Sequence, residues 1–177
     1  SNWRNNIYVT WTQFDAYDSK DPKDSSNIMF SYSSDGGSNW SNALKINQLS
    51  GDCLDSSNTT EGAVPCVGPN GEVYVSWSAH DKLYFDRSTD AGSTWLTDDI
   101  VAGSQYGGWV YDIPGLFRCN GLPITACDIS DSQYKGNIYI NYSDIRNGAN
   151  DADVFIIKSS DGGSSWSDAI RVNDDPV

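Results

Sequence analysis

A group of polar and aromatic residues in the segment 103–121 suits carbohydrate chemistry. Trp109 and Tyr111 offer aromatic faces, and Asp112 offers a carboxylate that could accept hydrogen bonds or transfer a proton. Arg118 offers a planar guanidinium that binds a carboxylate through two hydrogen bonds. Packing over a core is the alternative interpretation for the two aromatic residues.

A second group follows a predicted strand, in the loop 144–151. Arg146 could receive a ligand carboxylate there, whereas an ion pair between Asp144 and Arg146 that closes the loop is the alternative. Glu61, at the start of another predicted strand, could act as a base. The predicted catalytic residues are Glu61, Asp112, Arg118 and Arg146, and the predicted substrate-binding residues are Trp109, Tyr111 and Asp144.

An acidic segment near the N-terminus could hold a metal ion. Asp15, Asp18, Asp21 and Asp24 recur every three residues, and oxygen ligands at such spacing could bind calcium. The segment lacks the EF-hand pattern, and a solvated acidic loop is the alternative. No predicted role requires a cofactor, so calcium would stiffen the loop rather than take part in catalysis.

The four cysteines form two pairs that are close in sequence. Neither pair has the CxxC spacing of zinc or redox sites, so the sequence predicts the disulfides Cys53–Cys66 and Cys119–Cys127. Disulfides imply an oxidising compartment. No stretch is long and apolar enough to span a bilayer. The sequence therefore predicts a secreted or cell-surface protein without a transmembrane segment.

A motif that occurs three times indicates which elements position these residues. Its pattern is Ser-x-Asp-x-Gly-x-(Thr/Ser/Asn)-Trp, and it begins at Ser33, Ser88 and Ser159. We expect a hairpin turn in which the Asp accepts backbone N–H bonds, the Gly adopts a positive φ and the Trp packs between sheets. The structural residues are Asp35, Gly37 and Trp40, then Asp90, Gly92 and Trp95, then Asp161, Gly163 and Trp166.

Predicted β-strands surround each motif. A Tyr-containing strand lies upstream at 7–12, 73–78 and 138–143, and a shorter strand flanks the motif on each side. Two copies have one more strand, within 62–67 and 122–129. These strands predict three sheets, of which the first lacks its innermost strand: blade A at 1–49, blade B at 61–103 and blade C at 116–175.

The repeat resembles the Asp-box, or BNR, repeat of sialidase-like β-propellers, where the motif connects the third and fourth strands of a blade. The resemblance covers almost the whole chain and implies an all-β fold of four-stranded antiparallel blades around an axis. It also implies a six-bladed ring, so three blades would make about half of one. Blades from sequence outside this chain are the expected partner, and a second copy that closes the ring is the alternative.

The implied function is tied to one face of the propeller. Strand parity places the long loops together, and binding sites are usually built from such loops. The resemblance implies a glycan-processing or glycan-binding propeller, with exo-sialidase-like hydrolysis as its enzymatic form, although the Arg-Ile-Pro signature of sialidases is absent from this sequence. A non-catalytic adhesion or protein-interaction module is the alternative. The formal charge of -13 argues against nucleic acid, which leaves glycans or a surface or secreted protein as partners.

Overall fold

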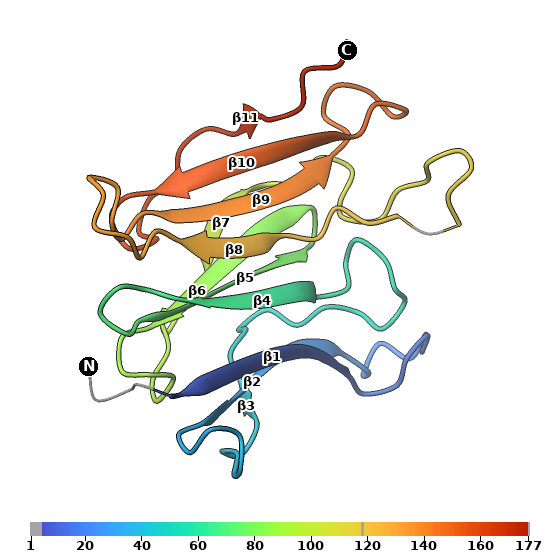
Figure 1. Ribbon diagram of the computed structural model, residues 1–177. Coiled ribbons are helices and arrows are strands. Elements are labelled where there is room, and N and C mark those ends of the chain that lie inside the picture. The colour runs from blue at the N-terminus through green and yellow to red at the C-terminus, as the bar shows by residue number, and fades with distance from the viewer. Residues whose placement is uncertain (1–4, 118, 177) are drawn as a thin grey trace.

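The structure, a computed structural model, describes residues 5–117 and 119–176 and confirms the predicted all-β propeller fold. Within this range it contains three antiparallel sheets, and no helix of the length and apolar character that would cross a membrane (Figure 1). The strands are β1 (Ile7–Phe14), β2 (Ser26–Ser33), β3 (Leu44–Lys45), β4 (Glu61–Val67), β5 (Val73–Ala79), β6 (Lys82–Ser88), β7 (Ile100–Ser104), β8 (Ile124–Cys127), β9 (Ile138–Asp144), β10 (Asp153–Ser159) and β11 (Ile170–Arg171).

Each sheet keeps its strands in chain order and forms one blade. Blade A contains β1–β3, blade B contains β4–β7 and blade C contains β8–β11. β1 pairs with β2 along its whole length, from Ile7 opposite Ser33 to Phe14 opposite Ser26. β1 corresponds to the second strands of the other blades, so its inner edge has no strand partner in the described part of the chain.

The long connections gather at one end of the blades, on the right in Figure 1. We call this end the loop face. The Asp-box turns lie at the opposite ends of the same strands, because each turn starts where β2, β6 or β10 ends. The loop face carries the connections 15–25, 46–60, 105–123 and 145–152.

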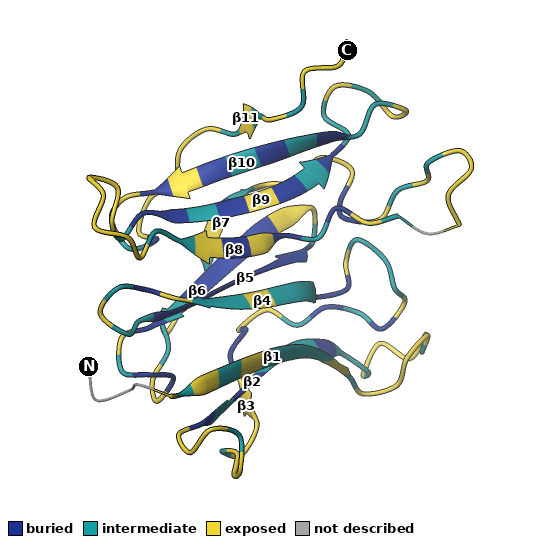
Figure 2. Ribbon diagram, in the orientation of Figure 1, coloured by how far each residue is buried: buried dark blue, intermediate teal, exposed yellow. Residues whose placement is uncertain are grey.

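Two apolar seams hold the three blades together. The two middle strands of blade B, β5 and β6, are the most deeply buried, because blade B packs against a neighbour on both sides (Figure 2). Phe30 of blade A and Trp77 of blade B lie in the A–B seam, and Phe85 of blade B and Ile140 of blade C lie in the B–C seam. Each fully buried side chain of this size contributes about 1.5–3 kcal/mol.

The three Asp-box turns share one hydrogen-bond pattern. In blade B, the Ser88 hydroxyl donates to Asp90 at 2.7 Å and accepts the Gly92 N–H at 2.8 Å, while Asp90 accepts the Thr94 N–H at 2.8 Å. Blades A and C repeat these bonds. In blade A, hydrogen bonds from the side chain and backbone of Asn39 lower the pKa of Asp35 to about 2. The Asp is therefore a structural anion of the turn.

Each seam is locked by an Asp-box glycine and a phenylalanine of the preceding blade. A Cβ on Gly92 would lie 2.4 Å from the Phe30 ring, so only glycine allows this approach. Trp95 then covers Phe30 edge-on, with ring centroids 4.8 Å apart. Gly163 and Trp166 hold Phe85 in the same way, with ring centroids 5.1 Å apart.

Blade B differs from blades A and C at the residue that follows the motif tryptophan, Trp95. In blades A and C a serine at this place accepts a backbone N–H from the strand before the turn: Ser41 accepts that of Tyr32 in β2, and Ser167 that of Lys158 in β10. Blade B has Leu96 instead, and the buried Asp86 carboxylate accepts the Arg87 and Leu96 N–H groups at 2.6 and 3.0 Å. Asp86 thus takes over the acceptor role of the serine.

The structure corrects the disulfide prediction, because all four cysteines are free. Cys53 lies in a connection at the loop face, whereas Cys66 lies near the far end of β4, five residues or roughly 16 Å from Glu61. Cys119 and Cys127 are separated in the same way by β8. Burial raises the pKa of Cys66 to about 12 and that of Cys127 to about 11. These thiols are therefore protonated at neutral pH.

Candidate functional site

A cavity of about 270 Å³ on the loop face brings together two of the predicted substrate-binding residues, Trp109 and Tyr111, and one predicted catalytic residue, Asp112. It is formed between the connection that precedes β4 and the connection that precedes β8. Its lining residues are Asp55, Trp109, Val110, Tyr111, Asp112, Phe117 and Cys119.

Trp109 forms the fixed wall of this cavity. Its side chain is only 2% exposed, and its indole N–H donates to the Thr59 carbonyl at 3.2 Å. Its own carbonyl accepts the Gly121 N–H at 2.8 Å, which holds the two ends of the loop together. Most of the Trp109 side chain therefore packs over the core, as in the alternative interpretation, instead of facing a ligand.

Tyr111 and Asp112 supply the polar groups of the same wall. Tyr111 is half-buried and interacts with Ser143 and Cys119. Burial raises the pKa of the Tyr111 phenol, so the hydroxyl keeps its proton at neutral pH and can donate a hydrogen bond. Asp112 is exposed and offers a carboxylate acceptor beside this donor.

Two further lining residues were not predicted from the sequence. Asp55 comes from the connection between blades A and B, and its carboxylate accepts the Tyr17 hydroxyl at 2.8 Å. Phe117 is fully exposed at the rim. Phe117 could have been found from the sequence, because it is an apolar residue next to the predicted Arg118. The approach of Asp55 is a long-range contact that no local pattern encodes.

Asp144 and Arg146 form the loop-closing ion pair instead of an open binding site. Asp144 is fully buried and Arg146 contacts its carboxylate at 2.6 Å. The Arg146 guanidinium also donates to the Tyr142 hydroxyl at 2.8 Å and lies 4.0 Å from the Phe155 ring centroid. The hydrogen bond from Arg146 to Asp144 raises the pKa of the arginine. The substrate-binding role predicted for Asp144 is therefore wrong in this geometry.

The predicted catalytic residues do not share one cavity in the described structure. Glu61 begins β4 opposite Ser78, outside the cavity around Tyr111. Arg146 lines a separate groove between blades B and C. Arg118 lies outside the described residues, so its role stays a prediction. Of the three that the structure describes, only Asp112 lines the cavity.

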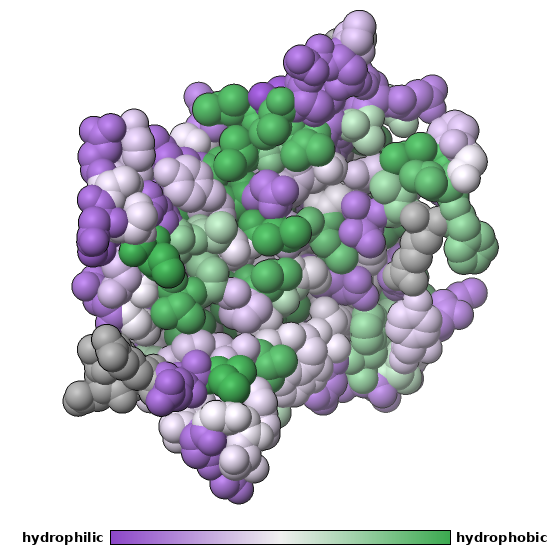
Figure 3. Space-filling model, in the orientation of Figure 1, coloured by the Kyte–Doolittle hydropathy of each residue, from purple (hydrophilic) through white to green (hydrophobic). Residues whose placement is uncertain are grey.

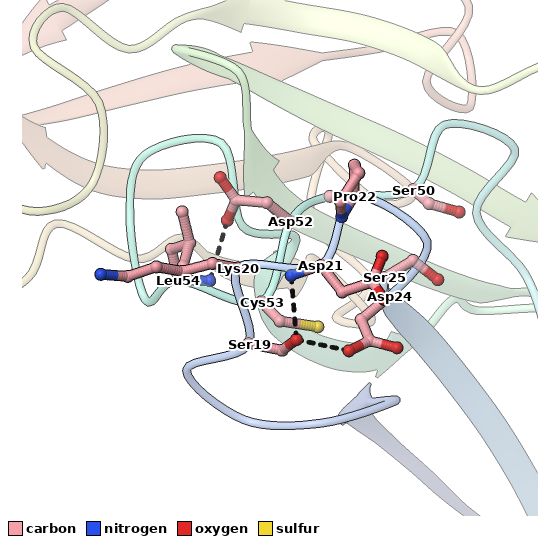
Figure 4. A pocket seen from close by; sticks show the side chains of 11 residues that line it. Ser19, Lys20, Asp21, Pro22, Asp24, Ser25, Ser50, Asp52, Cys53 and Leu54 are labelled. Carbon is pink, nitrogen blue, oxygen red and sulfur yellow. Dashed lines mark hydrogen bonds between the residues drawn. The ribbon is translucent and has the colours of Figure 1, made fainter.

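A second cavity on the loop face, of about 480 Å³, is lined by part of the acidic loop (Figure 4). Figure 4 shows Asp24 accepting the Ser19 hydroxyl and Asp52 accepting the Leu54 N–H at 3.1 Å. Bonding to Thr59 and other neighbours lowers the pKa of Asp52, although burial opposes this. These carboxylates fold the loop by local hydrogen bonds.

The four aspartates of the predicted calcium site do not converge. Asp15 accepts the backbone and hydroxyl of Ser25 at 2.8 and 2.9 Å, outside the cavity that Asp21 and Asp24 line. No three of the four come within 4.8 Å of one another, although all four are described. The structure therefore does not bring these four aspartates together as one calcium site.

One cluster of three carboxylates does occur in the described residues, at Asp151, Asp153 and Asp175. Its buried member, Asp153, already pairs with the Arg171 guanidinium at 2.6 Å and accepts the Asn173 amide. Arg171 thus offsets one of the three negative charges, and its bonds to Asp153 and Asp175 tie β10 to the segment after β11.

Antiparallel blades with a repeated Ser/Asp/Gly/Trp turn at one end, and long loops and a cavity at the other, are the architecture of a β-propeller. The structure of this chain is similar to a point mutant of the NanB sialidase from Streptococcus pneumoniae, with a TM-score of 0.54, 16% identity and coverage of 84% of this chain and 19% of that chain. It is also similar to NanB with Optactamide, with a TM-score of 0.54, 15% identity and coverage of 95% and 25%.

The chain therefore spans a quarter or less of the length of these two sialidase chains. No family model matches the sequence, and no curated protein matches it. At this identity the likeness shows the shared fold.

Proposed function

We propose that the loop face of this sialidase-like propeller portion binds a glycan in the cavity around Tyr111. The observation that supports the proposal is the combination of a half-buried, protonated phenol with two carboxylates, Asp55 and Asp112, in one cavity. The aromatic ring can stack on the C–H face of a sugar, and the carboxylates can accept its hydroxyl groups. Such a glycan would be displayed outside the cell.

The geometry favours recognition over hydrolysis. A glycosidase of the common type needs two carboxyl groups on either side of the scissile bond, one of which carries a proton. The cavity holds two carboxylates, but Asp55 accepts the Tyr17 hydroxyl and Asp112 is exposed to water, so neither is placed as a proton donor. Glu61, the predicted base, lies outside the cavity, and burial keeps the Tyr111 hydroxyl protonated rather than nucleophilic. The cavity volume of about 270 Å³ is at the small end for ligand sites, which suits the terminal residue of a glycan.

The substitution Tyr111→Ala is expected to weaken glycan binding by about tenfold, because it removes the stacking surface and one hydrogen-bond donor. Titration calorimetry against neutral and sialylated oligosaccharides measures this loss. Tyr134→Ala is the matched control, because Tyr134 is 52% exposed in the connection between β8 and β9, away from the loop face.

Two further variants assign the contributions. Tyr111→Phe keeps the ring and removes only the hydroxyl, so it separates stacking from hydrogen bonding. Arg118→Gln tests whether that arginine selects sialylated over neutral glycans. Equal affinities for the Tyr111→Ala and Tyr134→Ala proteins would contradict the proposed site, and turnover of a fluorogenic sialoside by the unmodified chain would contradict a purely binding role.

A further inference from the structure

Within the residues that the structure describes, blades A and C each leave one broad face without a neighbouring blade. The A face contains Ile7, Val9, Gly37 and Trp40. The C face contains Ile124, Ile156 and Ile170.

Residues of the A face occupy places that are buried in the other blades. Ile7 is 42% exposed, whereas Val73 and Ile138, at the same place in blades B and C, are fully buried against the preceding blade. Val9 is 39% exposed, whereas Val75 and Ile140, at the same place in blades B and C, are fully buried. The A face therefore has the composition of a seam but no blade packed against it.

The A face also carries an open copy of the seam lock. In blade B the glycine and Trp95 enclose Phe30 of the preceding blade. In blade A, a Cβ on Gly37 would meet only Ile7 of the same blade, at 3.6 Å, and Trp40 is 47% exposed. Gly37 and Trp40 thus form a socket whose apolar occupant is not supplied by the described part of the chain.

The C face presents the matching side chain. Ile156 stands three residues before the Asp-box serine, the place that Phe30 and Phe85 occupy in blades A and B. Strand register places Ile124, Ile156 and Ile170 in one row across blade C, with Asn141 between the first two. Figure 3 shows hydrophobic surface over β10 and β11 and over the inner strands, between hydrophilic ends.

We propose that the A face of one chain packs against the C face of a second copy, with Ile156 in the socket formed by Gly37 and Trp40. The contact continues the A–B and B–C seams, which already use the same combination of glycine, tryptophan and apolar side chain. Two copies of three blades give six, within the range of about four to eight blades in closed propellers. Two such head-to-tail contacts close a ring and leave neither apolar face in water.

Light scattering during size-exclusion chromatography tests the proposal, with an expected mass of twice the 19.4 kDa of one chain. Val9→Asp and Ile156→Asp are each expected to weaken self-association about 100-fold, because each buries a carboxylate in an apolar seam. Val101→Asp is the matched control, since Val101 is a 50% exposed valine of blade B and belongs to neither face.

A mixing experiment tests the head-to-tail geometry directly. In an equimolar mixture of the Val9→Asp and Ile156→Asp proteins, one of the two seams joins two unchanged faces, so dimers are expected to reappear. This recovery also shows that both variants fold. A monomeric unmodified chain would overturn the proposal, and so would a dimer that only one of the two substitutions disrupts, because that pattern requires like faces to pair.

Discussion

Gly163→Ala is expected to lower the free energy of unfolding by about 2–4 kcal/mol. Gly163 has a φ of +92°, and a Cβ there would lie 2.1 Å from a ring carbon of Phe85. Phe85 is fully buried and is covered by Trp166, so its ring has no free space to move into. The methyl group must therefore separate blades B and C.

Gly36→Ala is the matched control for this substitution. Gly36 also has a positive φ, of +73°, but a Cβ there would meet nothing within 4 Å. We therefore expect Gly36→Ala to lower the free energy of unfolding by only about 1 kcal/mol, the cost of a positive φ in alanine. Urea unfolding of the two variants and the unmodified chain measures the difference. Equal losses of stability would show that backbone conformation, and not contact with Phe85, explains the glycine at this place in the seam.

The second large effect concerns pH and the buried carboxyl groups of blade B. Asp86 is fully buried, and burial raises its pKa to about 7, with a further contribution from Asp99. Because Phe85 pairs with Ile100, the next step of the same ladder places Asp86 opposite Asp99. Each has one buried oxygen without a hydrogen-bond partner in the described structure, Oδ2 of Asp86 and Oδ1 of Asp99.

The expected result is a loss of stability of about 2–4 kcal/mol as the pH rises from about 4 to about 7. The folded-state pKa of Asp86 exceeds the ordinary value of 3.8 for an aspartic acid side chain, so folding favours the protonated form. This contribution is fully present below the unfolded pKa and disappears as the pH passes the folded value. Lys45, Tyr84 and Arg87 also face this pair, and the attraction of Lys45 partly offsets the raised pKa of Asp99.

Asp86→Asn is expected to remove most of this pH dependence and to stabilise the protein at pH 8 by about 1–3 kcal/mol. The asparagine oxygen still accepts the Arg87 and Leu96 N–H groups, and its amide can donate to the unpaired oxygen of Asp99. Thermal unfolding at several pH values measures both effects. Asp98→Asn, at an exposed position beside Asp99, serves as the control. An unchanged pH profile in the Asp86→Asn protein would assign the titration to other groups.

The sequence predicted the fold well because the Asp-box is a local device. Ser, Asp and Gly at fixed spacing satisfy each other's hydrogen bonds within one turn, so the same spacing produces the same turn three times. These turns determine where the strands reverse, and hence which connections reach the loop face. Strand count and sheet order were predictable for this reason.

The site was less predictable because it depends on contacts between distant segments. The cysteine pairs are close in sequence, but a strand carries the members of each pair to opposite ends of a blade. The acidic loop repeats every three residues, yet its carboxylates bind neighbours such as Ser19 and Ser25. Asp55 reaches the cavity from another blade connection, which only the packing of the blades determines.

The open inner edge of β1 has a consequence for how this chain behaves in solution. In the described residues this edge has no strand partner, so its main-chain groups would accept almost any extended segment, because strand addition depends on backbone hydrogen bonds more than on side chains. Thr10 and Thr12 reach across to carbonyls of Ala63 and Thr60, which steadies the strand without covering that edge. Blade A is therefore the point at which strand-by-strand aggregation would begin. A short peptide with alternating apolar residues would pair with β1 and block further strand addition.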